Sequence, residues 1–218
     1  MTKKLILIGA SNFGDEIVQL FRDINSYKNI PEWDIIGFLD DDINITGKIR
    51  NGIHVLGTRE WIEKNDISEI YFVCCIGNPK IKAKIVDYFK TYKAKFATGI
   101  HPSVIMSNTS LIGEGSVITA GNIITTNAVL GNHIIVNLAC TIGHYSILED
   151  YCTINPGVNI SGDVLLKEGV YIGTNATILE KIIVGKYSII GAGAVVNKHL
   201  PEHVTAVGVP AKVLKTNH

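Results

Sequence analysis

A single histidine stands in a part of the sequence that is rich in apolar and small residues. His144 lies between Gly143 and Tyr145 in the stretch Cys140–Gly157. Imidazole exchanges protons close to neutral pH, so this side chain could act as a general base. A solvated histidine at a turn would have the same local sequence. The spacing of the residues around it must therefore decide which position His144 takes.

A second candidate site lies near the N-terminus. Gly9–Gly14 (GASNFG) follows an apolar run and opens a helical pattern, so its free N–H groups could bind phosphate. The loop lacks the middle glycine of G-x-G-x-x-G and therefore matches the dinucleotide fingerprint poorly. Asp40–Asp42 follow a second apolar run. Two interpretations fit these residues: contacts to a ligand, or a solvated loop after a strand.

The four cysteines, Cys74, Cys75, Cys140 and Cys152, have no metal-binding or redox spacing. Cysteine is among the residue types most often buried, so we interpret them as small core residues rather than nucleophiles. We expect no structural disulfide in a reducing compartment and no metal site.

The composition argues against two classes of protein. The 218 residues contain 20 Lys and Arg and 20 Asp and Glu, and this zero net charge argues against nucleic-acid binding. No segment approaches the roughly 20 apolar residues of a membrane helix. Leu5–Ile8 is interrupted by Gly9, which favours a first strand over a signal peptide. We expect a cytoplasmic protein without membrane insertion.

Residues 1–98 alternate between patterns typical of strands and of helices. The predicted strands are Lys4–Ile8, Ile35–Leu39 and Ile70–Ile76, and the predicted helices are Asp15–Asn25 and Ile81–Tyr92. This order predicts an α/β, Rossmann-like domain with a small parallel sheet.

From residue 99 the pattern changes to a period of six. Every sixth residue from Ile112 to Val196 is Ile, Leu or Val, a period that neither a helix nor an alternating strand produces. It predicts a three-sided parallel β-helix with one hexapeptide per side, or about eighteen residues per turn, over residues 99–200. A tail loop, residues 201–218, would follow. A second inward position, four residues after each aliphatic, holds mostly small or β-branched residues and includes Cys140 and Cys152.

The residues just before the inward aliphatics are mostly apolar and should face outward. They are Val117, Ile123, Val129, Ile135, Ile147, Leu165, Tyr171, Ile183, Ile189 and Val195. Walls of this composition would be too apolar to stay hydrated, so we expect an oligomer.

Taken together, these features resemble the NeuD/PglD family of bacterial sugar acyltransferases. The resemblance rests on the hexapeptide ladder, the ending Gly208–Lys212, the Gly9–Gly14 loop, the Asp40-Asp41 pair and Ile76–Asn78. It implies a left-handed β-helix and a homotrimer. It also implies acetyl-CoA in the groove between subunits, and a nucleotide-linked sugar on the N-terminal domain.

The resemblance also implies the catalytic residues. His144 falls at the family's catalytic position, on a coil corner, where it would take a proton from the attacking sugar group. The N–H of Gly162 would stabilise the oxyanion. Family members usually carry Glu or Asp directly after this histidine, whereas this chain has Tyr145. We expect Asp163, about one strand spacing (about 4.8 Å) above Tyr145, or Glu149 to replace that carboxylate.

Ligand contacts carry over in the same way. The acetyl-CoA contacts would be Thr153, Gly162, Thr174 and Ala192. Gly191–Gly193 would let the pantetheine arm pass, and Lys212 meets either a CoA phosphate or solvent. The nucleotide-sugar contacts would be Ser11, Asn12, Phe13, Asp40, Asp41 and Gly77.

Our first hypothesis is therefore an acetyl-CoA-dependent N-acetyltransferase that acts on a nucleotide-linked amino sugar in surface polysaccharide biosynthesis. The alternative enzyme is an O-acetyltransferase of sialic acid or a related sugar. Two non-catalytic alternatives remain: an inactive nucleotide-sugar-binding trimer, and an NAD-binding protein with Asp40 on the ribose.

Overall fold

The computed structural model describes residues 2–217, which form two compact units. The first unit comprises the chain up to Gly77 together with Ile81–Pro102, and the second comprises Asn78–Lys80 and the chain from Ser103 onward. None of the helices in residues 2–217 is long and apolar enough to cross a lipid bilayer.

The first unit is built around a six-stranded sheet in the order β3-β4-β2-β1-β5-β6. Its strands are β1 (Lys3–Ile8), β2 (Trp33–Leu39), β3 (Ile49–Arg50), β4 (Ile53–Gly57), β5 (Ile70–Cys74) and β6 (Lys95–Phe96). The helical segments are α1 (Asn12–Tyr27), η1 (Ile43–Ile45), η2 (Arg59–Lys64) and α2 (Pro79–Thr91), and the short strand β7 (Gly99–Ile100) contacts α1. All pairings are parallel except β3 with β4. The predicted α/β domain with a small parallel sheet is confirmed.

The β3–β4 hairpin was not predicted, although the sequence carries its signal. Asn51 and Gly52 both have positive φ, 48° and 77°, as a two-residue type I′ turn requires. Asn-Gly is the strongest short-range hairpin signal. The hairpin carries Arg50 to the start of α1, where the guanidinium contacts Asn12 and Asp15.

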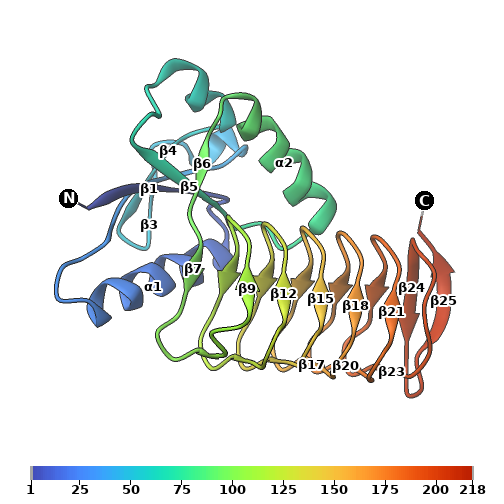
Figure 1. The fold of residues 1–218 in the computed structure, drawn as a ribbon. Coiled ribbons are helices and arrows are strands. Elements are labelled where there is room, and N and C mark those ends of the chain that lie inside the picture. Colours follow the sequence, from blue (N-terminus) through green and yellow to red (C-terminus); the bar gives the residue numbers. More distant parts are fainter. Residues whose placement is uncertain (1, 218) are drawn as a thin grey trace. The chain divides into compact units, whose positions relative to one another are not determined.

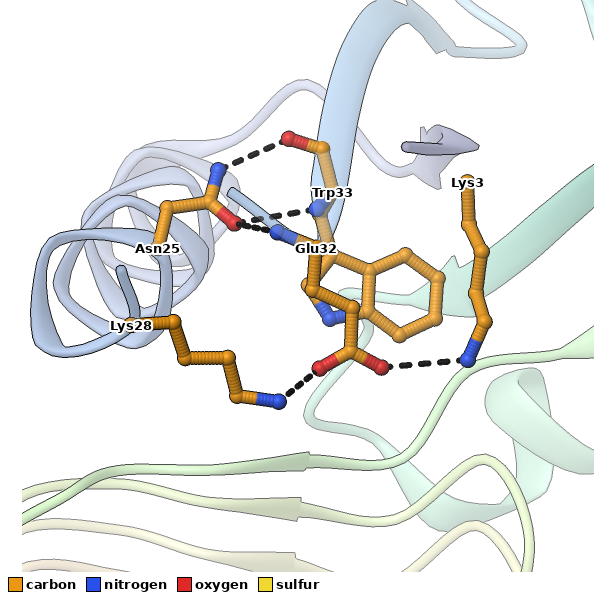
Figure 2. A network of polar contacts seen from close by, with 5 residues as sticks. All are labelled: Lys3, Asn25, Lys28, Glu32 and Trp33. Carbon is orange, nitrogen blue, oxygen red and sulfur yellow. Dashed lines mark hydrogen bonds and ion pairs between the residues drawn. The ribbon is translucent and has the colours of Figure 1, made fainter. Parts of the chain in front are cut away.

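The end of α1 is fastened to the start of β2 by one asparagine (Figure 2). The Asn25 amide donates to the Trp33 carbonyl at 2.7 Å, and its oxygen accepts the N–H groups of Glu32 and Trp33 at 3.0 and 2.9 Å. The Glu32 carboxylate pairs with Lys28 and Lys3. The hydrogen bond from Lys28 lowers the pKa of Glu32, although partial burial opposes the shift. These contacts fix the connection that brings Asp40, at the end of β2, beside the end of β1.

The second unit consists of three parallel sheets of two-residue strands (Figure 1). The β10 sheet contains β10 (Val117–Ile118), β13 (Ile135–Val136), β16 (Thr153–Ile154), β19 (Tyr171–Ile172) and β22 (Ile189–Ile190). The β8 sheet contains β8 (Ile105–Met106), β11 (Ile123–Ile124), β14 (Thr141–Ile142), β17 (Asn159–Ile160), β20 (Thr177–Ile178) and β23 (Val195–Val196). The β9 sheet contains β9 (Leu111–Ile112), β12 (Val129–Leu130), β15 (Ile147–Leu148), β18 (Leu165–Leu166) and β21 (Ile183–Val184). The predicted β-helix is confirmed, because paired residues such as Thr141 and Asn159 lie 18 residues apart.

The period of six forms the core of the β-helix. The step-six aliphatics from Ile118 to Val196 are no more than 2% exposed, and Ile112, on the first strand of its sheet, is partly exposed. The second inward position is equally buried. Its serines join successive coils: the Ser146 hydroxyl donates to the Ser161 carbonyl at 2.9 Å and accepts the Val164 N–H at 3.2 Å.

Two cysteines take the place of serine in this pattern. The thiols of Cys140 and Cys152 lie 3.1 and 3.3 Å from the carbonyls of Asn155 and Lys167, the contact that serine makes elsewhere. Both residues are fully buried, and Cys74 and Cys75 are buried in the first unit. Burial raises the pKa of Cys74 and Cys140 to about 11 and that of Cys75 well above its usual value.

We therefore expect all four thiols to resist reagents that attack the thiolate. Ellman's reagent at pH 8 should label none of them in the native protein and all four in guanidinium chloride. Rapid labelling of a native cysteine would contradict the core assignment.

The residues in the outward position differ in how far they are exposed. Ile123, Val129 and Ile147 are 41%, 39% and 45% exposed, as expected for outward-facing walls. Val117 and Ile135 hold the same position before an inward aliphatic, yet they are only 0% and 2% exposed. Both belong to adjacent strands of the β10 sheet, so this part of the wall is covered. A period of six indicates which residues point inward and carries no information on what covers the outside.

The tail expected as a loop contains a β-hairpin. Strand β24 (Val204–Val207) pairs in parallel with β22, and β25 (Lys212–Thr216) pairs antiparallel with β24. The prism therefore ends in a paired strand instead of exposing the edge of β22, as Figure 1 shows.

Candidate active site

His144 lies at the corner between β14 and β15. Its side chain is 57% exposed, and the backbone N–H of Asp163, one coil later, donates to its carbonyl at 2.8 Å. The preceding Gly143 allows the two coils to meet, because a Cβ there would lie 2.5 Å from the backbone nitrogen of Gly162. The corner therefore holds an exposed imidazole on a rigid backbone.

A carboxylate faces the imidazole from the next coil. Asp163 Oδ2 lies 4.0 Å from His144 Nδ1, which is ion-pair distance rather than hydrogen-bond distance. A carboxylate at Nδ1 favours the tautomer that carries its proton there and leaves Nε2 as the acceptor. Both side chains are about half exposed, so water and salt partly screen their interaction.

Tyr145 contacts the imidazole through its ring. The two ring centroids are 5.9 Å apart and the planes meet at 80°, an edge-to-face arrangement. The Tyr145 side chain is 58% exposed, and its backbone has a φ of 56°. The tyrosine therefore lines the corner beside His144 and supplies no charge to it.

The alternative carboxylate, Glu149, does not serve His144. Its oxygens bind the Lys167 ammonium at 2.8 Å and the Glu168 N–H at 3.0 Å, at the following corner of the coil. These bonds lower the pKa of Glu149 even though burial opposes the shift. The expectation that Glu149 could replace the missing acid is wrong, because five residues along a coil lead past the next side of the prism.

Gly162 lies directly above His144. Its N–H has no hydrogen-bond acceptor among residues 2–217, so the donor is available to a ligand. The other predicted acetyl-CoA contacts are not gathered here. Thr174 and Ala192 are exposed on another corner, one coil apart, whereas Thr153 is buried in β16 at 2% exposure. Lys212 is exposed in β25.

The predicted sugar-binding residues of the first unit lie after the ends of neighbouring parallel strands, where open α/β sheets bind ligands. Asp40 follows β2 and accepts the N–H groups of Ala10 and Asp42 at 2.8 and 2.9 Å. Ser11 caps α1 by accepting the Gly14 N–H at 3.4 Å. Gly77 follows β5, and a Cβ there would meet nothing within 4 Å. Asp40 and Ser11 thus hold the loop in shape.

Two arginines in this region escaped the sequence analysis. Arg50 grips Asp15 with two hydrogen bonds, of 3.0 and 2.7 Å, and donates to Asn12 Oδ1 at 2.7 Å. Arg59 holds both oxygens of Asp41 and thereby lowers the pKa of that carboxyl group. Phe13, which lies between Asn12 and Asp15 in the sequence, is half buried at the start of α1. No group of three metal-binding side chains occurs in the described part of the chain.

Two family descriptions match the chain, one in each unit. Residues 4–89 match the PglD N-terminal domain, and residues 163–198 match six bacterial transferase hexapeptide repeats. The acetyltransferase domain of PglB from Neisseria gonorrhoeae FA1090, solved with acetyl coenzyme A, is 31% identical. The alignment covers 98% of this chain and 100% of that one, with a TM-score of 0.90. The chain belongs to the PglD-type family of hexapeptide-repeat sugar N-acetyltransferases.

Other relatives of this PglD-type acetyltransferase agree with that assignment. WeeI from Acinetobacter baumannii AYE is 28% identical, with coverage of 98% and 100% and a TM-score of 0.86. GDP-perosamine N-acetyltransferase from Escherichia coli O157:H7 is 28% identical over 132 residues, or 61% of this chain. That match spans 58% of the length of the Escherichia coli protein.

Proposed function

We propose that the chain transfers the acetyl group of acetyl-CoA to the amino group of a nucleotide-linked sugar. The observation that carries this proposal is the exposed His144 with Asp163 at Nδ1, on a corner of a hexapeptide β-helix of this family. The PglB domain was solved with acetyl coenzyme A, and the Escherichia coli relative is named for an amino sugar linked to GDP.

The reaction needs one base and one oxyanion donor. The sugar amine attacks the thioester carbonyl carbon while His144 Nε2 removes an amine proton. Negative charge develops on the carbonyl oxygen, and the free N–H of Gly162 stabilises it. The carbon–sulfur bond then breaks, the amide forms, and the imidazolium returns its proton to the CoA thiolate. Asp163 stabilises the imidazolium, and Tyr145 lines the acceptor side.

Acetyl-CoA fits the β-helix through backbone groups. The thin pantetheine arm would pass Gly191–Gly193, where a Cβ on Gly193 would meet nothing within 4 Å. Thr174 and Ala192 belong to that same exposed corner and would contact the cofactor there. Because they lie on a different corner from Gly162, we assign the two sets of contacts to different subunits of a trimer.

The N-terminal unit would bind the nucleotide-linked sugar. Ser11, Asn12 and Phe13 begin α1, so their N–H groups face a ligand at a helix N-terminus, a position that favours phosphate. Asp40 and the Asp41–Arg59 pair shape the loops around it. Acetyl-CoA and activated sugars are cytoplasmic metabolites, so the reaction is placed in the cytoplasm.

An apolar stripe on the β9 sheet supports the trimer. Its members are Leu111, Val129, Ile147, Leu165 and Ile183, one on each coil, and all but Leu165 are between 39% and 63% exposed. Ile147 follows His144 by three residues, so a second copy seated on this stripe would adjoin the base.

We expect Ile147→Lys to dissociate the trimer, because the buried ammonium would have no partner in an apolar interface. Light scattering after size-exclusion chromatography should give the mass of one chain for this variant and of three for the wild type. Ile30→Lys, which alters an isoleucine that is 77% exposed in the first unit, should remain trimeric. An unchanged mass for Ile147→Lys would exclude the stripe as the interface.

The test of the function is turnover of acetyl-CoA, followed as thiol release, against UDP-, GDP- and dTDP-linked amino sugars and sialic acid. Mass spectrometry of the product would locate the acetyl group on nitrogen or oxygen. Turnover with an amino sugar and an N-acetyl product would support the proposal. An O-acetyl product, or acetyl-CoA binding without turnover of any acceptor, would contradict it.

A further inference from the structure

The imidazole of His144 occupies the space that a side chain at position 162 would need. A Cβ on Gly162 would lie 2.5 Å from His144 Nε2, 2.8 Å from Nδ1 and closer still to Cε1. Its three nearest atoms all belong to this ring. Real Cβ atoms essentially never show contacts under 3.0 Å, so a side chain at this position would displace the ring.

The backbone gives no other reason for a glycine at this corner. Gly162 does not have a positive φ, and the left-handed position of the turn is taken by Asp163, whose φ is 57°. Alanine would therefore fit the backbone at position 162 without strain. The missing side chain serves the ring alone.

Two other glycines of the β-helix also face a ring one coil away, with the glycine on the earlier coil and the ring on the later one. A Cβ on Gly115 would lie 2.5 Å from Cε1 of His133, and one on Gly169 would lie 2.9 Å from Cζ of Tyr187. Those two glycines have φ of 70° and 68°, so their backbone also requires glycine. Gly162 is the case in which only the ring requires it.

We propose that Gly162 is a positioning residue that sets the plane of the catalytic imidazole. The ring rests on the Gly162 backbone, which holds Nδ1 toward Asp163 and leaves Nε2 to the acceptor. This role rests on the proposed function and adds a steric task to the N–H that Gly162 supplies. The dipeptide Gly162-Asp163 thus acts as one unit: the first residue makes room for the base and the second holds it.

The decisive variant is Gly162→Ala, which retains the N–H and moves only the ring. Displacements of about 1 Å cost up to about a hundredfold in rate, so we expect kcat to fall about tenfold. KM for acetyl-CoA should stay within about twofold, and the pH–rate profile should move toward that of Asp163→Asn. An unchanged kcat and pH profile would overturn the proposal, and so would a loss confined to the KM of acetyl-CoA.

A double-mutant cycle tests the steric contact between position 162 and the His144 ring without measuring turnover. Gly162→Ala should lower the Tm of the wild type by a few degrees, because the methyl group and the ring compete for one space. In the His144→Ala background the same change should leave Tm unaltered, because the space is then free. An equal loss of Tm in both backgrounds would overturn the proposed contact between Gly162 and the His144 ring. If no acceptor sugar were acetylated, the proposed function would be contradicted. The Tm values of this cycle would still test the contact between Gly162 and the His144 ring.

Discussion

The variant His144→Ala should lose about 10²- to 10⁴-fold in kcat for acetyl transfer, the contribution of a positioned general base. The Gly162 N–H and the backbone of the Gly191–Gly193 corner are untouched by this change. Acetyl-CoA should therefore still raise the Tm of the variant as it does that of the wild type, because binding to the folded state stabilises it. Stopped assays of thiol release, together with a thermal-shift titration, would measure both effects.

The matched control is His54→Ala, which removes an exposed histidine in β4 of the first unit. It should leave kcat unchanged. If His144→Ala retained most of its activity while His54→Ala behaved like the wild type, a group other than His144 would be the base. If His144→Ala lost acetyl-CoA binding as well as turnover, the histidine would be a binding residue.

The second large effect should come from Asp163→Asn. The 4.0 Å between Asp163 and the imidazole corresponds to about 1 kcal/mol in water and about 4 kcal/mol in partly screened surroundings, so we expect kcat to fall about ten- to a hundredfold. The loss arises because the imidazolium formed during transfer no longer faces a negative charge. For the same reason the pH–rate profile should differ from that of the wild type, and added salt should weaken the wild-type advantage.

Glu149→Gln is the matched control for this charge, because that carboxylate binds Lys167 and the Glu168 N–H at another corner. Its pH–rate profile should coincide with that of the wild type. Coincident profiles for wild type, Asp163→Asn and Glu149→Gln would mean that His144 acts without a carboxylate. Tyr145→Phe, which removes a hydroxyl group and keeps the ring contact, would then show whether the tyrosine supports the base.

The β-helix could be predicted from the sequence because one repeated physical requirement shaped it. An inward position admits only aliphatic or small side chains, and this leaves a period of six that survives every change outside. The same arithmetic placed Asp163 above the His144 corner, since the coil repeats every 18 residues. Glu149 does not satisfy this repeat: it is five residues from His144 along the chain and lies at another corner, beside Lys167.

The rest depended on contacts that no local pattern records. Whether an outward residue meets water depends on what covers it, so Val117 and Ile135 could not be distinguished from exposed Ile123. Arg50 meets Asp15 35 residues away, and Arg59 meets Asp41 18 residues away, through loops without periodicity. The β3–β4 hairpin is different, because the Asn51-Gly52 pair is a local sequence signal for a two-residue hairpin turn.

The coils stack with a rise of one strand spacing, about 4.8 Å, per turn of the prism. Groups on the same corner, such as His144 and Gly162, can differ in height only by whole turns, so the distance between them along the prism is quantised. Removing one complete turn between two such groups would shorten their distance along the prism by one strand spacing, while every buried aliphatic kept its register. Removing a single residue would instead rotate the interior of all later coils outward.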